Sequence, residues 1–172
     1  GDWSSDVCSS DLVRVKNSYN ITSPGSIIVE KHTGKTSPVC AITTVKKISL
    51  IDIQSSRMLG AAGFLAHVFN QFLKWNISID VIATSEVSVS LTVNSKDKLE
   101  GLIEDLERVA DVEVHSGKAI VTVVCDAKHS SSILAAGFEA LSDEGINVQM
   151  ISQGASKVNI SMIVDEDEAE RT

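Results

Sequence analysis

Apolar and polar residues follow two different periods along the chain, and both become regular after Pro38. Runs of β-branched residues, and apolar residues at every second position, predict strands because successive side chains of a strand point to opposite faces. Apolar residues three or four positions apart predict helices because they form one stripe on a helix. The first series of elements predicts strands over residues 39–45, 48–53, 77–81, 87–93 and 112–114, and helices over residues 64–75 and 99–109.

The elements from residue 48 onwards occur in the order strand, helix, strand, strand, helix, strand. That order is typical of the ferredoxin-like, split βαβ unit. The same order begins again with a strand over residues 120–125 and a helix over residues 133–141, followed by alternating strands over residues 146–150 and 158–164.

A constant offset relates the two series of elements. Leu65 corresponds to Leu134 and Ile79 to Val148, and the members of each pair are 69 residues apart. Agreement across a helix and a strand indicates an internal duplication. We therefore expect an α+β fold with two tandem ferredoxin-like units. The second unit is expected to be truncated, without its last helix and strand, and to expose apolar surface through which the chain dimerises or aggregates.

The ends of the chain lack the regular pattern. Residues 1–12 resemble the translation of a sequencing-adapter oligonucleotide, so we expect them to be disordered and exclude them from the fold. Short strands are predicted at residues 13–15 and 27–29, and Ser95 is the expected N-cap of the second helix. Residues 165–172 are mostly acidic, which suits the first turn of a truncated helix because of the helix dipole.

Composition excludes several classes of protein. The chain has 172 residues, of which 43% are hydrophobic and 22% charged, so it is not a disordered acidic tail. The net charge of −8 argues against a protein that binds the phosphate backbone of a nucleic acid. No apolar run approaches the roughly 18 residues of a membrane span. We expect neither nucleic acid nor membrane as a partner.

Motifs for catalysis and metal binding are missing from the sequence. Cys8, Cys40 and Cys125 lack the spacing of zinc ligands or of a disulfide framework, which favours a reducing compartment. Gly34-Lys35-Thr36 lacks the preceding glycine of a phosphate-binding loop, because Val29 occupies that position. We expect no catalytic residue and no metal site.

Two segments suggest binding chemistry instead. Gly60 and Gly63 precede the helix that begins at Phe64, and free N–H groups at a helix start hold anions such as a carboxylate. Asp80 lies among alternating apolar residues, where a carboxylate needs a partner, and Glu86 lies at the following bend. A tight turn and a carboxylate paired with a lysine are the alternatives. Together the segments suit an amino acid, which carries both a carboxylate and an ammonium group.

Long motifs in these same segments resemble a known family. Residues 56–69 and 79–91 resemble the first regulatory ACT domain of aspartate kinase, and residues 148–162 resemble the second. Residues 14–20, followed by Pro24-Gly25, resemble the end of its kinase domain. The resemblance covers residues 13–171 and is strongest to the monofunctional, lysine-sensitive form of plants and some bacteria.

The resemblance implies a domain organisation. Residues 13–37 would be the end of the kinase domain and a linker, residues 38–117 the first ACT domain, and residues 118–164 an incomplete second one. It also implies that the strand over residues 39–45 joins the sheet of the second ACT domain, beside residues 120–125.

The resemblance also implies a function. Aspartate kinase transfers the γ-phosphate of ATP, with Mg²⁺, to the β-carboxylate of aspartate, and L-lysine inhibits it by binding between two ACT domains of a homodimer. The helix start near Phe64 would hold the lysine carboxylate, and Asp80 would face an ammonium group. Lys16 would lie near the nucleotide of the parent enzyme, whereas this chain alone would be inactive. The implied lysine contacts are Met58, Phe64, Leu65, Ser78, Ile79, Asp80, Thr84, Ser85 and Glu86.

Further partners and alternatives follow from the same resemblance. Plant relatives bind S-adenosylmethionine as a second effector, and a plant or algal source would imply a plastid location, any other source the cytoplasm. A bifunctional kinase fused to homoserine dehydrogenase, a free-standing ACT amino-acid sensor and a metabolic dehydrogenase with ACT domains are the competing interpretations.

Overall fold

The computed structural model describes residues 13–20, 22–28, 39–60, 62–94, 99–125, 127–156 and 158–172. These residues fall in two compact units, Gly1–Thr36 and Ser37–Thr172. In the first unit, β1 (Val13–Val15) pairs with β2 (Ser26–Ile28) as an antiparallel hairpin. The interpretations of residues 1–12 as adapter sequence, of Gly34-Lys35-Thr36 as linker and of Ser95 as N-cap lie outside the described residues.

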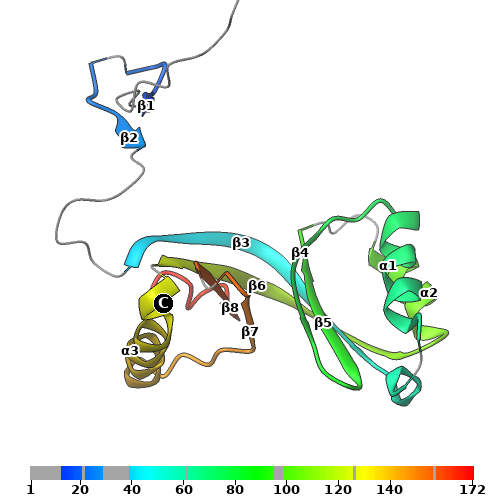
Figure 1. The fold of residues 1–172 in the computed structure, drawn as a ribbon. Helices are drawn as coiled ribbons and strands as arrows, with labels where there is room; N and C mark the ends of the chain where they lie inside the picture. Colours follow the sequence, from blue (N-terminus) through cyan, green and yellow to red (C-terminus); the bar gives the residue numbers. More distant parts are fainter. Residues whose placement is uncertain are drawn as a thin grey trace, which may run out of the picture. The chain divides into compact units, whose positions relative to one another are not determined.

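The second unit is built on one antiparallel sheet of six strands, in the order β4-β5-β3-β6-β8-β7 (Figure 1). Its strands are β3 (Val39–Gln54), β4 (Ile79–Thr84), β5 (Ser88–Val93), β6 (Asp111–Cys125), β7 (Met150–Gln153) and β8 (Asn159–Asp165). Its helices are α1 (Phe64–Lys74), α2 (Leu99–Glu107) and α3 (Ser130–Asp143), with short 3-10 turns η1 (Ser56–Met58) and η2 (Ala127–His129).

The sheet contains two lobes with the same internal order of strands. The first lobe, residues 48–116, has the order β4-β5-β3-β6 and carries α1 and α2 (Figure 1). The second lobe, residues 39–45 and 118–165, has the order β7-β8-β6-β3 and carries α3. The predicted α+β, ferredoxin-like class is confirmed, and the shared order agrees with the duplication.

Two strands run through both lobes, where the sequence predicted four shorter ones. β3 continues past residue 45 and β6 continues past residue 114, so these predicted breaks are wrong. Lys46 and Lys47 interrupt the apolar pattern without ending the strand, because a register shift between Val45 and Ile48 absorbs them. Lys47 has φ 62° and Gly117 on the neighbouring strand has φ 72°. Such bulges bend a strand while preserving its pairing.

The second lobe has its fourth strand. The first half of β3 pairs with β6, with Val45 opposite Ile120 and Val39 opposite Cys125. This confirms the pairing that the resemblance implied, and the expectation that the second unit lacks a last strand is wrong. Residues 166–172 form successive turns and not the expected helix. The Glu166 N–H donates to the Gly117 carbonyl, which ties the first of these turns to the sheet.

Each lobe ends its first helix in the same way, which shortens a predicted strand. Asn76 and Gly145 have φ values of 52° and 69°, in the left-handed region. The next residue then bonds back to the helix, from Ile77 N–H to the Phe72 carbonyl and from Ile146 N–H to that of Leu141. This is the Schellman cap of a helix C-terminus. The strands predicted from residues 77 and 146 therefore begin at Ile79 and Met150.

Three apolar cores follow from the alternation along the strands. Ile51 and Ile53 of β3 lie in the first core, beneath α1 and α2. Ile48 and Leu50 point to the opposite face and lie in a third core. That third core joins β4 to β7, because Val81 of β4 and Met150 of β7 both pack in it. The second core lies between the second lobe's sheet and α3.

Candidate functional site

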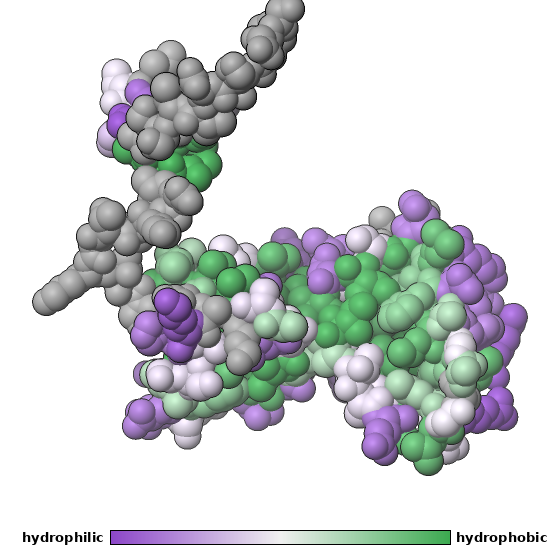
Figure 2. Space-filling model, in the orientation of Figure 1, coloured by the Kyte–Doolittle hydropathy of each residue, from purple (hydrophilic) through white to green (hydrophobic). Residues whose placement is uncertain are grey.

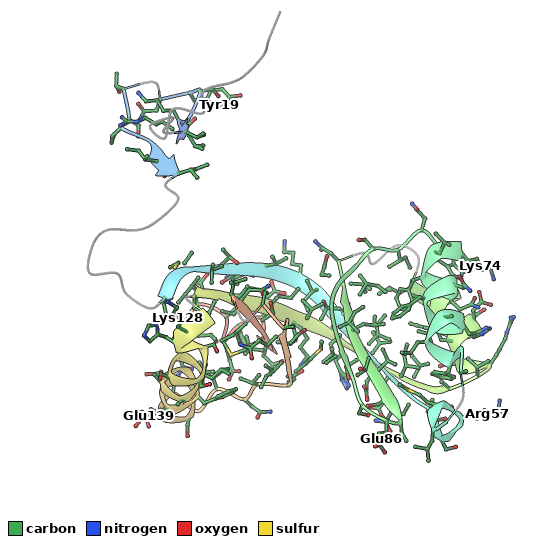
Figure 3. All side chains as sticks on the ribbon, viewed as in Figure 1. Tyr19, Arg57, Lys74, Glu86, Lys128 and Glu139 are labelled. Carbon is green, nitrogen blue, oxygen red and sulfur yellow. The ribbon has the colours of Figure 1, made fainter. Side chains whose placement is uncertain are left out.

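The candidate binding site lies at one end of the first lobe, where β3 leads into η1. Ser55 connects three elements there. Its N–H donates to the Val87 carbonyl at 2.9 Å, and its hydroxyl donates to the Val109 carbonyl at 3.3 Å and accepts from the Arg57 N–H at 3.3 Å. The start of η1, the β4–β5 hairpin and the end of α2 are therefore held together. In Figure 3, Arg57 and Glu86 lie at this end of the lobe and Lys74 at the other.

The N-terminus of α1 is uncapped and open. Gly63 is the N-cap residue, with φ 93°, and as a glycine it has no side chain to cap the first-turn N–H groups. A Cβ built at Gly60 or Gly63 would meet no atom within 4 Å, so the space beside this turn is empty. Free N–H groups at a helix start, together with the helix dipole, attract an anionic group. The predicted carboxylate receptor thus has suitable geometry in the backbone.

The β4–β5 hairpin carries the second group of predicted contacts, Thr84, Ser85 and Glu86. The Ser85 hydroxyl accepts from the N–H groups of Ser88 and Val87 at 3.0 and 3.3 Å, and lies 2.7 Å from the Ser88 hydroxyl. Ser85 therefore stabilises the turn itself. Glu86 is exposed at the tip, and within the described residues no side chain pairs with its carboxylate.

Ser78, Ile79 and Asp80 lie at the opposite end of β4. Ile79 packs against the first core, whereas Ser78 and Asp80 are exposed. Exposure alternates along β4, and Asp80 occupies an exposed position between the half-buried Ile79 and Val81, so the argument that its carboxylate is desolvated is wrong. No ion pair to Asp80 occurs among the described residues. The alternative in which a lysine of the same chain pairs with Asp80 therefore gains no support.

Within one chain, the predicted lysine contacts lie in two separate groups, at opposite ends of β4. Met58 and Phe64 are half-buried against the first core and Leu65 is 36% exposed. These three lie on η1 and the start of α1, near the hairpin tip. Asp80 is four residues from Thr84 along an extended strand, which corresponds to about 13 Å. A ligand the size of one amino acid does not reach both groups within a single copy.

A buried carboxylate that the sequence analysis missed lies at the far end of the lobe. Asp105 of α2 is 9% exposed and accepts from Lys74 Nζ at 2.5 Å and from Trp75 Nε1 at 2.8 Å. Arg108 lies 3.2 Å from its other oxygen. These hydrogen bonds and charges lower the pKa of Asp105 below its usual value. Its position three residues after Leu102, on the apolar stripe of α2, was the available signal.

The second lobe does not repeat the carboxylate of Asp80. The 69-residue offset, which also relates the two helix caps, places Gln149 at the position of Asp80. The second lobe therefore has an amide there in place of a carboxylate.

Other chemistry is sparse in the described part of the chain. Cys40 is exposed and Cys125 is buried, and no three His, Cys, Asp or Glu residues described here gather as metal ligands. None of the described helices is long and apolar enough to cross a membrane. Lys16 is exposed just after β1.

Comparison with known sequences agrees with the resemblance. A family model described as "ACT domain" matches residues 121–172. "Aspartokinase 3, chloroplastic" from Arabidopsis thaliana is 47% identical over 167 residues, which cover 92% of this chain and 30% of that protein. The chain thus spans about 30% of the length of this relative.

Solved structures show the same relationship. Escherichia coli aspartokinase III, in complex with lysine and aspartate, matches with a TM-score of 0.73 and 32% identity, over 87% of this chain and 35% of that one. The regulatory subunit of aspartate kinase from Thermus thermophilus shares the fold, with a TM-score of 0.65 and 22% identity, over 78% of this chain and 92% of that one. The chain is therefore a homologue of the regulatory ACT region of aspartokinases.

Proposed function

We propose that the chain is the lysine-sensing region of an aspartate kinase, which phosphorylates the β-carboxylate of L-aspartate with ATP. The observation that carries the proposal is that the first lobe combines the open N-terminus of α1 with two exposed carboxylates, Glu86 at the hairpin tip and Asp80 at the far end of β4. An anion receptor and two exposed carboxylates match the carboxylate and the two ammonium groups of lysine. A homologue was solved with lysine and aspartate bound.

Two copies of the first lobe would bring the separated contacts together. β4 is at the edge of the sheet order, and Ile82 is the midpoint between the two groups of contacts. In an antiparallel pair of β4 strands centred on Ile82, Asp80 of one copy faces Thr84 of the second. Directly opposed residues in such a pair have Cβ atoms about 5 Å apart. Ser78 likewise faces Glu86, so each of two equivalent sites takes one group from each copy.

An apolar surface beside β4 supports this homodimer. Leu65 and Leu73 of α1 are 36% and 76% exposed and lie on one stripe with the half-buried Phe69. Ile82 and Val87 extend the exposed apolar surface onto β4 and the hairpin. Figure 2 shows apolar surface over β4 and towards α1. Contiguous apolar surface of this kind is typical of a protein interface.

The mechanism is a differential affinity of lysine for two arrangements of the dimer. Lysine favours the arrangement that keeps Asp80 of one copy beside the hairpin of the other, and a ligand shifts an equilibrium only by such a difference in affinity. In the parent enzyme that arrangement would be the inactive one. The kinase activity, and ATP with Mg²⁺ as its co-substrate and cofactor, belong to the parent.

Calorimetric titration of L-lysine tests the proposed site. The Asp80→Ala variant should bind lysine about 10- to 100-fold more weakly, because it loses a hydrogen bond to a charged group. Asp143→Ala, which removes an exposed carboxylate at the end of α3, is the matched control and should bind as the wild type does. Unchanged affinity in Asp80→Ala would contradict the assignment of Asp80.

A mixing experiment tests whether the site is shared between copies. Asp80→Ala and Glu86→Ala chains should each bind lysine poorly, since each damages both sites of its dimer. An equimolar mixture that exchanges subunits should recover about a quarter of the wild-type lysine capacity, because each mixed dimer keeps one intact site. A mixture with no recovered capacity would contradict the shared site. Sedimentation equilibrium would check the dimer directly.

Two finer features are part of the proposal. S-adenosylmethionine as a second effector is tested by adding it to the lysine titration, where it should raise lysine affinity through positive coupling. A plastid location is supported by the chloroplastic relative, and localisation of the complete parent protein would test it.

A further inference from the structure

The two edge strands of the sheet are connected to each other. The hydroxyl of Ser152, on β7, donates to the main-chain carbonyl of Ile82, on β4, at 3.0 Å. These residues are 70 positions apart and belong to different lobes. β4 and β7 also contact each other along their backbones, although they lie at opposite ends of the strand order. The sheet is therefore bent so that β4 and β7 come into contact, although they do not pair as neighbouring strands.

An apolar contact accompanies this hydrogen bond. Val81 and Ala83, on either side of Ile82, pack against the third core. Met150 of β7 and Ile163 of β8 belong to the same core. The middle of β4 is thus held by a hydrogen bond and by packing, both from the second lobe.

The point of attachment lies midway along the strand that carries the proposed lysine contacts. Asp80 precedes Ile82 by two residues and Thr84 follows it by two. β4 also contains the register shift between Ile79 and Ile82, so its ladder with β5 is irregular at this point. A strand whose ladder is irregular depends more on its remaining contacts, here the bond from Ser152 and the third core.

We propose that Ser152 is a positioning residue, through which the second lobe fixes β4 for lysine binding and through which bound lysine is sensed by β7. The proposal rests on the proposed lysine site and adds to it the connection between the lobes. Because a carbonyl oxygen has two lone pairs, the bond from Ser152 leaves one for a second copy beside β4. Ligand binding that orders β4 then also orders β7, since the two strands share this bond and the third core.

Three variants of the 172-residue chain test the role of Ser152. Ser152→Ala removes the hydroxyl, Ser152→Thr retains one, and Ser156→Ala removes an exposed hydroxyl from the neighbouring hairpin as a control. Hydrogen exchange without lysine should be faster for the amides of residues 80–84 in Ser152→Ala, and close to the wild type in the other two. Lysine should bind Ser152→Ala about 3- to 10-fold more weakly, as expected for one lost hydrogen bond.

Exchange with saturating lysine tests the coupling. Lysine should slow the exchange of residues 150–153 in the wild type and in Ser152→Thr, and should slow it much less in Ser152→Ala. Lysine binding without protection of residues 150–153 in the wild type would overturn the coupling and leave the lysine site in place. Absence of lysine binding to the folded wild type would overturn the proposed function. Unchanged exchange of residues 80–84 in Ser152→Ala would overturn the positioning role in either case.

Discussion

The two lobes have the same strand order and the same helix cap, yet their helix-covered faces differ. In the first lobe, α2 buries Leu99, Leu102 and Leu106 beside α1. In the second lobe, a groove of about 360 Å³ lies between α3 and the sheet. Its walls include Ile42 of β3 and Leu134 of α3. The strands thus determine the topology, while helix cover determines how completely each core is closed.

The lobes differ in charge as well as in packing. Asp80 of the first lobe corresponds to Gln149 of the second. A duplication therefore preserved the fold in both copies, but the carboxylate at this position occurs in only one. We infer that the first lobe senses the ligand and the second supports it, through β3, β6 and the contact between β4 and β7.

Core truncation should produce the largest contrast between the lobes. Leu102→Ala removes a fully buried side chain of α2 and should lower the free energy of unfolding by about 3–5 kcal/mol. Leu134→Ala, at the half-buried wall of the groove, should cost only about 1 kcal/mol. Urea unfolding of both variants measures the difference. Equal losses would mean that the second core is as tightly closed as the first.

Glycine substitutions in the two helices should have opposite signs. A Cβ at Gly101 of α2 would collide with the Trp75 ring, so Gly101→Ala should destabilise the fold by about 1–3 kcal/mol. A Cβ at Gly137 of α3 would meet nothing within 4 Å. Gly137→Ala should therefore stabilise by about 0.5–1 kcal/mol through helix propensity. Thermal melts measure both, and a destabilised Gly137→Ala would argue against an open groove.

Substitutions at the bend between the lobes should have smaller effects. Gly117 has φ 72° and open space around it, so Gly117→Ala should cost about 1 kcal/mol from backbone strain alone. Lys47, at φ 62° on the adjacent strand, already carries that strain. Lys47→Gly should stabilise by about 0.5 kcal/mol, once the backbone entropy of glycine is subtracted. Opposite changes in the urea midpoint would support this; changes of the same sign would contradict it.

The ion pairs of Asp105 with Lys74 and of Asp165 with Lys118 should both be fully ionised at neutral pH. Their contributions to stability should differ slightly in acid. Hydrogen bonds from Lys74 lower the pKa of Asp105, and those from Lys118 lower that of Asp165. Each carboxylate is ionised and stabilising above its unfolded value near 3.9, and its contribution is lost as the pH falls through the lowered folded-state pKa.

Unfolding midpoints between pH 7 and pH 3 measure this loss. The decrease of the midpoint on acidification should become smaller in both variants, and the change should be larger in Asp105→Asn than in Asp165→Asn. The reason is that the Asp165 side chain is 43% exposed and its ion pair is more screened by solvent. The reverse order would contradict the expectation that the ion pair of Asp105 contributes more to stability than that of Asp165.

Local periodicity predicted the helices well, because each helix buries one face. The expected start at Phe64 coincides with that of α1. It failed where distant pairing decides the structure. Lys46-Lys47 predicts the end of a strand, yet β3 continues through these residues because it pairs with β6 on both sides of them. Asn76 gives no sequence signal of a helix cap, although its left-handed conformation forms part of the cap of α1 and delays the start of β4.

The sequence indicated which residue types could bind an amino acid, but not how these residues are arranged in space. Asp80 occupies an exposed position of β4, between the half-buried Ile79 and Val81, where the sequence analysis expected a desolvated carboxylate. Ser85 combines a predicted ligand contact with a turn-forming role that only its hydrogen bonds reveal. The bond from Ser152 to Ile82 joins residues 70 positions apart, and nothing local to either residue indicates it.

The most direct test is calorimetric titration of L-lysine into the wild type, Asp80→Ala and Gln149→Ala, with L-threonine as the control ligand. We predict saturable binding of one lysine per chain to the wild type and to Gln149→Ala, much weaker binding to Asp80→Ala, and no binding of threonine. Equal loss of lysine binding in the two variants would contradict a sensing role confined to the first lobe. No lysine binding by the folded wild type would contradict the sensing role altogether.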